Sequence, residues 1–284
     1  IIRLPVTEEF QNDFFGKFKK GRGNEFDNLF TFREYLPGIA AKARKGDNTT
    51  IGAALGGNTG IASYFHYEGD TVSQRIDVTT FSSRSFNGVR SERLGTPTEL
   101  ISERGKAYSV GSIVGMKSTL ALTIKVDTSP LDSFLDTLSG ITFNQAIFSI
   151  GEIEDQDENN NPISGMVMIF VDKNNKPITS TINGSQLYVQ LDGQPQVILD
   201  ANGNEVPNNL FASSAILRYE TQTKKFQTGI TSHINAVFRG KIQRKDWLLY
   251  ATTPQTGDDF KRSLRQFKVN KDKIKVQVIY SKSR

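Results

Sequence analysis

Apolar and polar positions alternate strictly in one stretch near the middle of the chain. In residues 118–126, STLALTIKV, leucine, isoleucine and valine occupy every second position from Leu120 to Val126. A period of two is typical of a strand that has one face in a core and the other towards water. We therefore expect a half-buried strand over these residues.

The pattern changes directly after this strand to the period of a helix. Ser129 provides an N-cap, and Pro130 fits the first helical position. Apolar residues then recur at i, i+3, i+4 and i+7 from Leu131 to Leu138. Gly140 ends the pattern, and the apolar segment ITFNQAIFSIGEI follows at once. We expect the helix to lie across one end of a sheet and to plug it.

Other segments give the same helical signal. Thr7 precedes an aromatic pattern at i, i+4 and i+8, and Thr231 or Ser232 provides a cap for TSHINAVFRG, which ends at Gly240. Short helices are therefore predicted at residues 7–18, 26–36, 129–138 and 231–239.

From Thr50 onwards, short apolar runs are separated by turns. The segments EDQDENNNPI, VDKNNKPI and LDANGNEV each place Asp and Asn between apolar runs, which is typical of hairpin turns. The final segment KIKVQVIYS alternates again and ties the C-terminus into a sheet. We predict an all-β fold, an antiparallel β-sandwich of jelly-roll type with several short peripheral helices.

The length of 284 residues allows one large β unit or two modest domains. The chain begins with the apolar segment IIRLPV, which reads as a strand that enters a sheet begun elsewhere. We expect residues 1–48 to form an N-terminal strand and helical segment that completes an absent upstream domain. Residues 49–284 are expected to form the main β-sandwich domain.

Composition and charge limit the kinds of functional site that this chain can have. The chain contains no cysteine, which excludes disulfides, thiolate metal sites and cysteine nucleophiles. The longest apolar run, residues 165–171, is far shorter than the ~20 residues that span a bilayer. The net charge of +5 is uneven, because residues 241–284 carry twelve Lys or Arg against four Asp. This basic region could meet the phosphates of lipid or nucleic acid.

The same basic residues also fit a solvated strand face. Lys271, Lys273 and Lys275 alternate with apolar residues, and neither a recognition helix nor an aromatic ladder accompanies them. We therefore expect no nucleic-acid partner.

One turn resembles part of a calcium-binding loop. Asp155, Asp157 and Asn159 match its first three ligand positions, but its glycine and glutamate positions are occupied by Asn160 and Met166. An ordinary hairpin turn accounts better for this segment, so we expect neither a metal nor another cofactor.

Aromatic residues are the candidates for ligand binding. Trp247 could stack on a sugar ring, but in DWLLYATT it shares a strand face with Leu249, which favours core packing. Tyr64 and Tyr67 are alternative residues that could stack on a sugar ring. The ligand-binding residues are otherwise unknown.

Catalytic groups are sparse. His66 and His233 are the only histidines, and neither has an acidic residue at a motif spacing. Glu152 and Glu154 share one strand face as a glycosidase pair could, but they lead into an acidic turn that fits solvated surface better. We therefore expect a protein that is not an enzyme.

The order of segments resembles a Bacteroidetes family of outer-membrane lipoproteins known as domain of unknown function 4270. The resemblance rests on IIRLPVTEEF, FREYLPGIAAKA, FNGVRSERLGT, LTIKVDTSPLDSFLDTLSGITFNQAIFSI and KDKIKVQVIYSK, which cover nearly the whole chain in the family's order. YSVGSIVGMKS departs from the family's more glycine-rich pattern. The family has no established catalytic residues, so none is carried over.

The resemblance implies a place at the outer membrane or cell surface, with attachment only through a lipid anchor upstream of this chain. We expect a non-enzymatic binding or structural subunit of an outer-membrane protein assembly, with an outer-membrane protein as partner. The alternatives are a carbohydrate-binding module with a glycan ligand and a carboxylate-dependent hydrolase.

Overall fold

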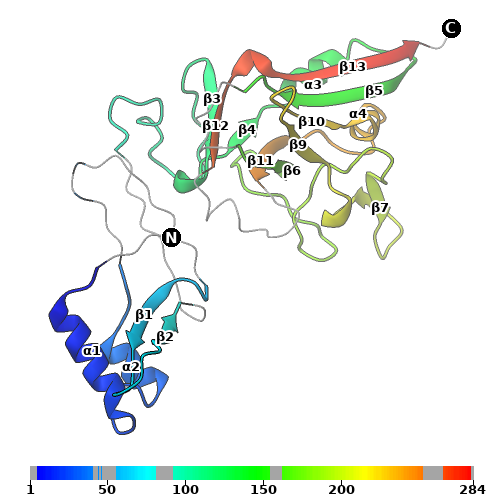
Figure 1. Ribbon diagram of the computed structural model, residues 1–284. Helices are drawn as coiled ribbons and strands as arrows, with labels where there is room; N and C mark the ends of the chain where they lie inside the picture. The colour runs from blue at the N-terminus through cyan, green and yellow to red at the C-terminus, as the bar shows by residue number, and fades with distance from the viewer. Residues whose placement is uncertain are drawn as a thin grey trace. The chain divides into compact units, whose positions relative to one another are not determined.

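The computed structural model describes residues 5–40, 44, 46, 56–80, 92–153, 162–251 and 265–282 (Figure 1). The chain falls into two compact units, residues 1–88 and residues 89–284. Each unit has its own packing.

The described residues of the first unit form two helices and one β-ribbon. Its elements are α1 (Glu8–Lys20), α2 (Leu29–Tyr35), β1 (Gly60–Phe65) and β2 (Gln74–Thr79). As predicted, Thr7 caps α1, because its hydroxyl oxygen accepts a hydrogen bond from the backbone N–H of Phe10 at 3.3 Å. The two strands pair in antiparallel orientation.

Aromatic rings connect the helices of this unit to its ribbon. The ring centroid of Phe65 in β1 lies 6.0 Å from that of Phe15 and 6.4 Å from that of Phe18 in α1. Phe14 is buried, and its ring centroid lies 5.2 Å from that of Phe26. β1 therefore packs on α1 within this unit. The domain boundary that we expected after residue 48 stays a prediction.

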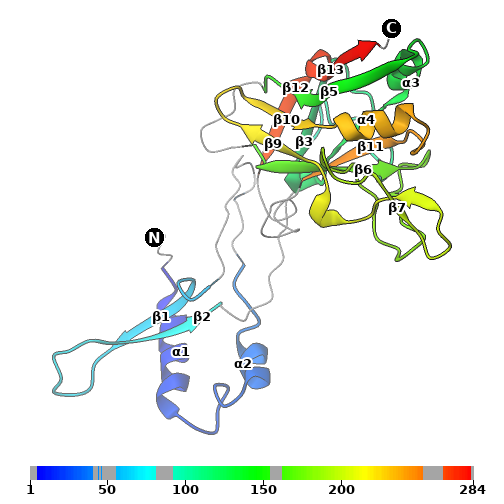
Figure 2. The same cartoon turned by 90° about the vertical axis from the view of Figure 1, so that its right-hand side faces the viewer.

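The second unit is built on one antiparallel sheet of seven strands in the order β13-β5-β10-β9-β6-β11-β4, so its edge strands are β13 and β4. The sheet is curled (Figure 2). Its strands are β4 (Ile124–Val126), β5 (Ile141–Ile150), β6 (Gly165–Val171), β9 (Ile216–Glu220), β10 (Lys225–Gly229), β11 (Asp246–Ala251) and β13 (Ile274–Lys282). The prediction of a mainly β, antiparallel fold with short helices is confirmed.

Shorter elements accompany this sheet. They are two ribbons, β3 (Ile113–Lys117) with β12 (Gln266–Asn270) and β7 (Val197–Leu199) with β8 (Glu205–Pro207), two helices, α3 (Ser129–Leu135) and α4 (Thr231–Phe238), and the 3-10 turns η1 (Ser118–Leu120), η2 (Phe211–Ser213) and η3 (Lys271–Lys273).

The predicted strand over residues 118–126 is wrong in its first half. The chain turns at η1, and Ala121 adopts a left-handed conformation with φ 51°. Lys117 and Leu122 then exchange two backbone hydrogen bonds at 3.1 and 3.0 Å, which closes a tight turn between β3 and β4. The alternation of apolar residues therefore crosses a turn, and only Ile124–Val126 forms a strand.

Two of the predicted hairpin turns are confirmed. The carboxylate of Asp172 accepts hydrogen bonds from the backbone N–H groups of Asn174 at 2.8 Å and Lys176 at 2.9 Å. Asp200 makes the equivalent bonds with the residues two and four positions later, between β7 and β8. Most of EDQDENNNPI lies outside the described residues.

Helix α4 fills the inner face of the sheet beside β5. Its predicted cap is wrong, because the N-cap residue is Ile230 and the capping oxygens come from Asp192 in a distant loop. One oxygen of this carboxylate accepts from the backbone N–H of Ser232 at 2.8 Å, and the other accepts from the Thr231 hydroxyl at 2.8 Å. Ile234 is buried in the core.

Helix α3 begins at Ser129, as the predicted range 129–138 has it, but it ends at Leu135. Its N-cap is Thr128, not Ser129, and Pro130 lies in the first turn as predicted. The hydroxyl of Thr128 donates to the backbone carbonyl of Lys245 at 3.0 Å, and its backbone N–H donates to Asp246 at 3.2 Å. These bonds attach the start of α3 to β11.

Candidate functional site

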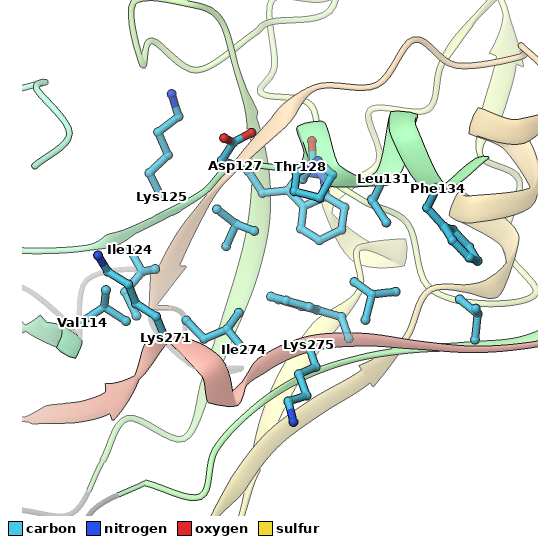
Figure 3. Close-up of a pocket in the computed structure, with 16 residues that line it drawn as sticks. Val114, Ile124, Lys125, Asp127, Thr128, Leu131, Phe134, Lys271, Ile274 and Lys275 are labelled. Atoms are coloured by element: carbon cyan, nitrogen blue, oxygen red, sulfur yellow. The ribbon is translucent and has the colours of Figure 1, made fainter. Parts of the chain in front are cut away.

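An apolar cavity of about 560 Å³ lies between the two edge strands β4 and β13 (Figure 3). Helix α3 contributes one wall, and β5 and β11 contribute its floor. Most of the lining side chains are apolar: Val114, Ile124, Val126, Pro130, Leu131, Phe134, Phe148, Trp247, Ile274, Val276 and Val278. We call this cavity the edge pocket.

The wall on β13 follows directly from the alternation of the sequence. Ile274, Val276 and Val278 lie on one face of the strand and line the edge pocket, whereas Lys275 and Gln277 between them are exposed. The register of β13 on β5 is antiparallel and places Val276 opposite Phe148. This pairing brings the C-terminal strand to the cavity.

The opposite wall comes from α3. Leu131 and Phe134 are three positions apart, so they project from the same side of the helix, and both line the cavity. Both side chains are only half-buried, whereas Leu135 of the same helix is packed in the core. The helix therefore leaves apolar surface open to the pocket.

Two aromatic rings form the floor. Phe148 of β5 and Trp247 of β11 meet edge to face, with ring centroids 5.3 Å apart and an interplanar angle of 73°. Each residue is 1% exposed. The indole Nε1–H of Trp247 has no hydrogen-bond acceptor among the residues that the structure describes.

Charged residues surround this apolar interior. Lys125, Asp127, Lys271 and Lys275 belong to the lining, and Figure 3 shows the amino groups of Lys125, Lys271 and Lys275 extending away from the apolar centre. Asp127 accepts a hydrogen bond from the backbone N–H of Ser129 at 2.8 Å, which holds the pKa of this carboxyl below its ordinary value. The rim carries more cations than anions.

A cluster of ion pairs lies beside the rim. Asp246 lies 3.1 Å from the amino group of Lys125 and 3.0 Å from the guanidinium of Arg244. Arg244 also binds Asp132 of α3. Because both acids are paired with cations, this cluster ties α3 to β11.

The sequence candidates are distributed across both units. Trp247 lies in the floor of the edge pocket and is buried, so the prediction of core packing is confirmed and its ring offers no exposed face to a sugar. Tyr64 and Tyr67 lie in the first unit and are 62% and 67% exposed. Tyr64 also meets Arg75, whose guanidinium carbon lies 5.7 Å from the ring centroid.

Other candidates do not enter a common site. Asp155, Asp157, Asn159 and Glu154 lie outside the described residues. Glu152 is exposed and lies 3.8 Å from the amino group of Lys225.

The two histidines have opposite environments. His66 is exposed in the first unit. His233 of α4 is 2% exposed and lies between the rings of Phe170 and Trp247, at centroid distances of 5.6 and 5.7 Å. Burial lowers the pKa of His233 to about 4, because the charged imidazolium would lose its hydration. His233 is therefore neutral at pH 7.

Two kinds of feature are absent from the part of the chain that the structure describes. No three His, Asp or Glu side chains gather closely enough to hold a metal ion. Each helix in the described ranges is too short or too polar to cross a bilayer.

Comparison with known proteins gives no match, either to a family model, to a curated protein or to a solved structure. The edge pocket itself was not predicted from the sequence. Its sequence signals are the apolar alternations that end at Val126 and that run from Ile274 to Val278, and the helical pattern of Leu131 and Phe134. Each of these patterns indicates a buried face but not what that face meets.

Proposed function

We propose that this chain is a non-enzymatic binding module and that the edge pocket is its binding element. The observation that carries the proposal is an apolar cavity of about 560 Å³ between two sheet edges that do not pair with each other. This volume falls within the ~300 to 1,000 Å³ of typical small-ligand sites.

The side chains that line the edge pocket favour an apolar ligand. Leu131, Phe134 and Val278 are half-buried, so each keeps apolar surface that a ligand would remove from water. Each buried methylene group of a ligand contributes about 0.8 kcal/mol. The cavity offers few polar partners, so a ligand that needs many hydrogen bonds would leave them unmade.

The cellular setting is part of the same proposal and rests on the family resemblance. The module belongs to an outer-membrane lipoprotein with a lipid anchor upstream and serves an outer-membrane protein assembly. Crosslinking and mass spectrometry in intact cells test this setting. Recovery of an outer-membrane protein supports it, and recovery of the isolated chain alone contradicts it. The jelly-roll form of the sandwich stays a prediction.

A carbohydrate-binding module is the second candidate, because Tyr64 and Tyr67 are exposed aromatic residues. The burial of Trp247 removes its third platform. A glycan array distinguishes the two: saturable binding that is lost in Tyr64→Ala favours a glycan, and an array without binders removes this candidate.

Direct binding of a fluorescent apolar probe tests whether the edge pocket takes up a ligand. We expect N-phenyl-1-naphthylamine to bind and to gain fluorescence. Val278→Phe fills the cavity from β13 and is expected to weaken probe binding at least tenfold. Gln277→Phe is the matched control, because residue 277 is exposed on the other face of the same strand. Equal binding by the two variants would contradict the proposal.

A further inference from the structure

We propose that the edge pocket receives a β-strand of a partner protein, an extended segment in which apolar residues alternate with acidic ones. The segment pairs with the free edge of β13 and places its apolar side chains in the cavity. Its carboxylates lie on the opposite face, beside Lys275. This inference rests on the proposed function and names the kind of partner that the edge pocket takes.

Strand β13 has one paired side and one free side in the part of the chain that the structure describes. It is the last strand of the seven-stranded sheet, and β5 is the strand that pairs with it (Figure 1). The backbone N–H and C=O groups along the free side of such a strand are a template for one more strand. The edge pocket lies on this free side, between β13 and β4.

The register shows which backbone groups of β13 face its free edge. Val278 lies opposite Ala146 of β5. The carbonyl of Ala146 accepts a hydrogen bond from the backbone N–H of Ile230 at 2.8 Å, and its N–H donates to the Thr231 hydroxyl at 3.0 Å, so both groups face away from β13. Opposite residues of this kind exchange no hydrogen bonds in an antiparallel pair. The N–H and C=O of Val278, and by the same alternation those of Val276, therefore face the free edge.

The side chains of the same two residues line the edge pocket. Val276 and Val278 are half-buried there. Residues that lie opposite each other on neighbouring strands project from the same face of the sheet. A strand that pairs with β13 therefore directs every second side chain into the cavity, where apolar residues fit. Its backbone groups bond to the edge of β13, so they need no polar partner inside the cavity.

The charge of β13 favours an acidic partner. Lys275 is exposed between Ile274 and Val276, and it takes part in no ion pair among the described residues. The strand also contains Lys282 and has no acidic residue. A second copy of this strand would add only positive charge, whereas a carboxylate opposite Lys275 forms a favourable cross-strand pair.

A synthetic peptide with the sequence EVEVEVE tests this inference by isothermal titration. We expect it to bind and to displace N-phenyl-1-naphthylamine, because its valines enter the same cavity. Lys275→Glu is expected to weaken this binding roughly two- to tenfold and to strengthen the binding of KVKVKVK by a similar factor. Lys173→Glu is the matched control, since Lys173 is exposed in the same unit and lies outside β13. Thermal unfolding checks that the variants fold.

Hydrogen exchange of single amides shows whether the peptide pairs with the edge. We expect EVEVEVE to slow the exchange of the Val276 and Val278 amides, which face the free edge. The amides of Lys275 and Gln277, which face β5, are expected to exchange at unchanged rates. The same peptide with methylated backbone nitrogens keeps its side chains but lacks N–H donors, so we expect its binding to be lost.

The outcomes distinguish the inference from the proposal beneath it. Binding of N-phenyl-1-naphthylamine without binding of the peptide would overturn the inference, while the edge pocket remained a binding site. Binding of neither would overturn both. Peptide binding that leaves the Val276 and Val278 amides unprotected, or that Lys275→Glu and Lys173→Glu change equally, would also overturn the inference.

Discussion

In the second unit, helices α3 and α4 pack against the same curled sheet, but their apolar side chains are buried to different extents. In α4, the side chains of His233 and Ile234 are buried, at 2% and 1% exposed. In α3, Leu131 and Phe134 stay half-buried and border the edge pocket. One helix completes the core and the other leaves a cavity beside it.

The difference lies in how each helix is held. The first turn of α4 is bound by the carboxylate of Asp192, and its apolar side chains enter the core. The first turn of α3 is held by polar bonds to β11, through Thr128 and through the pairing of Asp132 with Arg244. Polar attachment at one end keeps α3 in place without requiring its apolar face to be filled. The cavity is therefore a feature of the fold and not loose packing.

The largest difference should appear when one apolar side chain is removed from each helix. Ile234→Ala is expected to lower the free energy of unfolding by about 2 to 5 kcal/mol, because it leaves a cavity in a packed core. Leu131→Ala is expected to cost less than about 1 kcal/mol, because part of the side chain already faces open space. Urea denaturation measures both. Equal losses would remove the contrast between the helices.

Acid should weaken the α4 side through His233. Its folded pKa, about 4, lies below the unfolded value of about 6.5. Between these values the unfolded chain binds a proton and the folded chain does not, so stability is fully present above pH 6.5 and falls as the pH falls towards 4. The total loss is about 3 kcal/mol.

The two histidines of the chain provide the control for this effect. Denaturation at pH 7 and pH 4.5 should show the acid loss reduced in His233→Leu and retained in His66→Leu, since His66 is exposed. An unchanged pH dependence in His233→Leu would mean that the acid sensitivity originates elsewhere.

Removing the polar bonds that hold the start of α4 or of α3 should lower the free energy of unfolding by smaller amounts. Asp192→Ala removes the acceptor of the Ser232 backbone N–H and of the Thr231 hydroxyl at the start of α4, and it is expected to cost about 0.5 to 2 kcal/mol. Asp132→Ala removes an ion pair whose carboxylate side chain is 49% exposed, and it is expected to cost about 0.2 to 1 kcal/mol. Hydrogen exchange of the α4 amides should increase only in Asp192→Ala, and an increase in both variants would contradict separate attachments.

The smallest effect on stability is expected from filling the cavity. Val278→Phe should change the free energy of unfolding by no more than about 0.5 kcal/mol, because the added ring enters space that is open in the fold. Gln277→Phe on the exposed face should do the same. A loss of about 2 kcal/mol in Val278→Phe alone would show a tightly packed wall instead of a pocket.

Local patterns in the sequence predicted most of the elements. The alternation of KIKVQVIYS gave β13, the Asp-rich turns gave two hairpins, and Thr7 gave the start of α1. The same reasoning was wrong at residues 118–126, because a period of two continues through a turn when Ala121 takes a left-handed conformation. Periodicity records which side chains are buried, and the path of the backbone can change beneath it.

The edge pocket could not be predicted because its walls come from distant parts of the chain. Val126, Phe148, Trp247 and Val278 meet only after β13 pairs with β5 and β11 pairs with β4. Sequence patterns indicated a buried face for these strands but not their neighbours. For the same reason the cap of α4 was assigned to a local residue, whereas the structure uses Asp192 from a loop.

Quenching of Trp247 fluorescence by 1-bromododecane, an apolar chain that carries a bromine quencher, shows whether a ligand enters the edge pocket. Trp247 is the only tryptophan of the chain, and it lies in the floor of the edge pocket. We expect saturable quenching in the natural chain and in Gln277→Phe, and its loss in Val278→Phe. Absence of quenching in the natural chain, or equal quenching in both variants, would contradict a ligand site between β4 and β13.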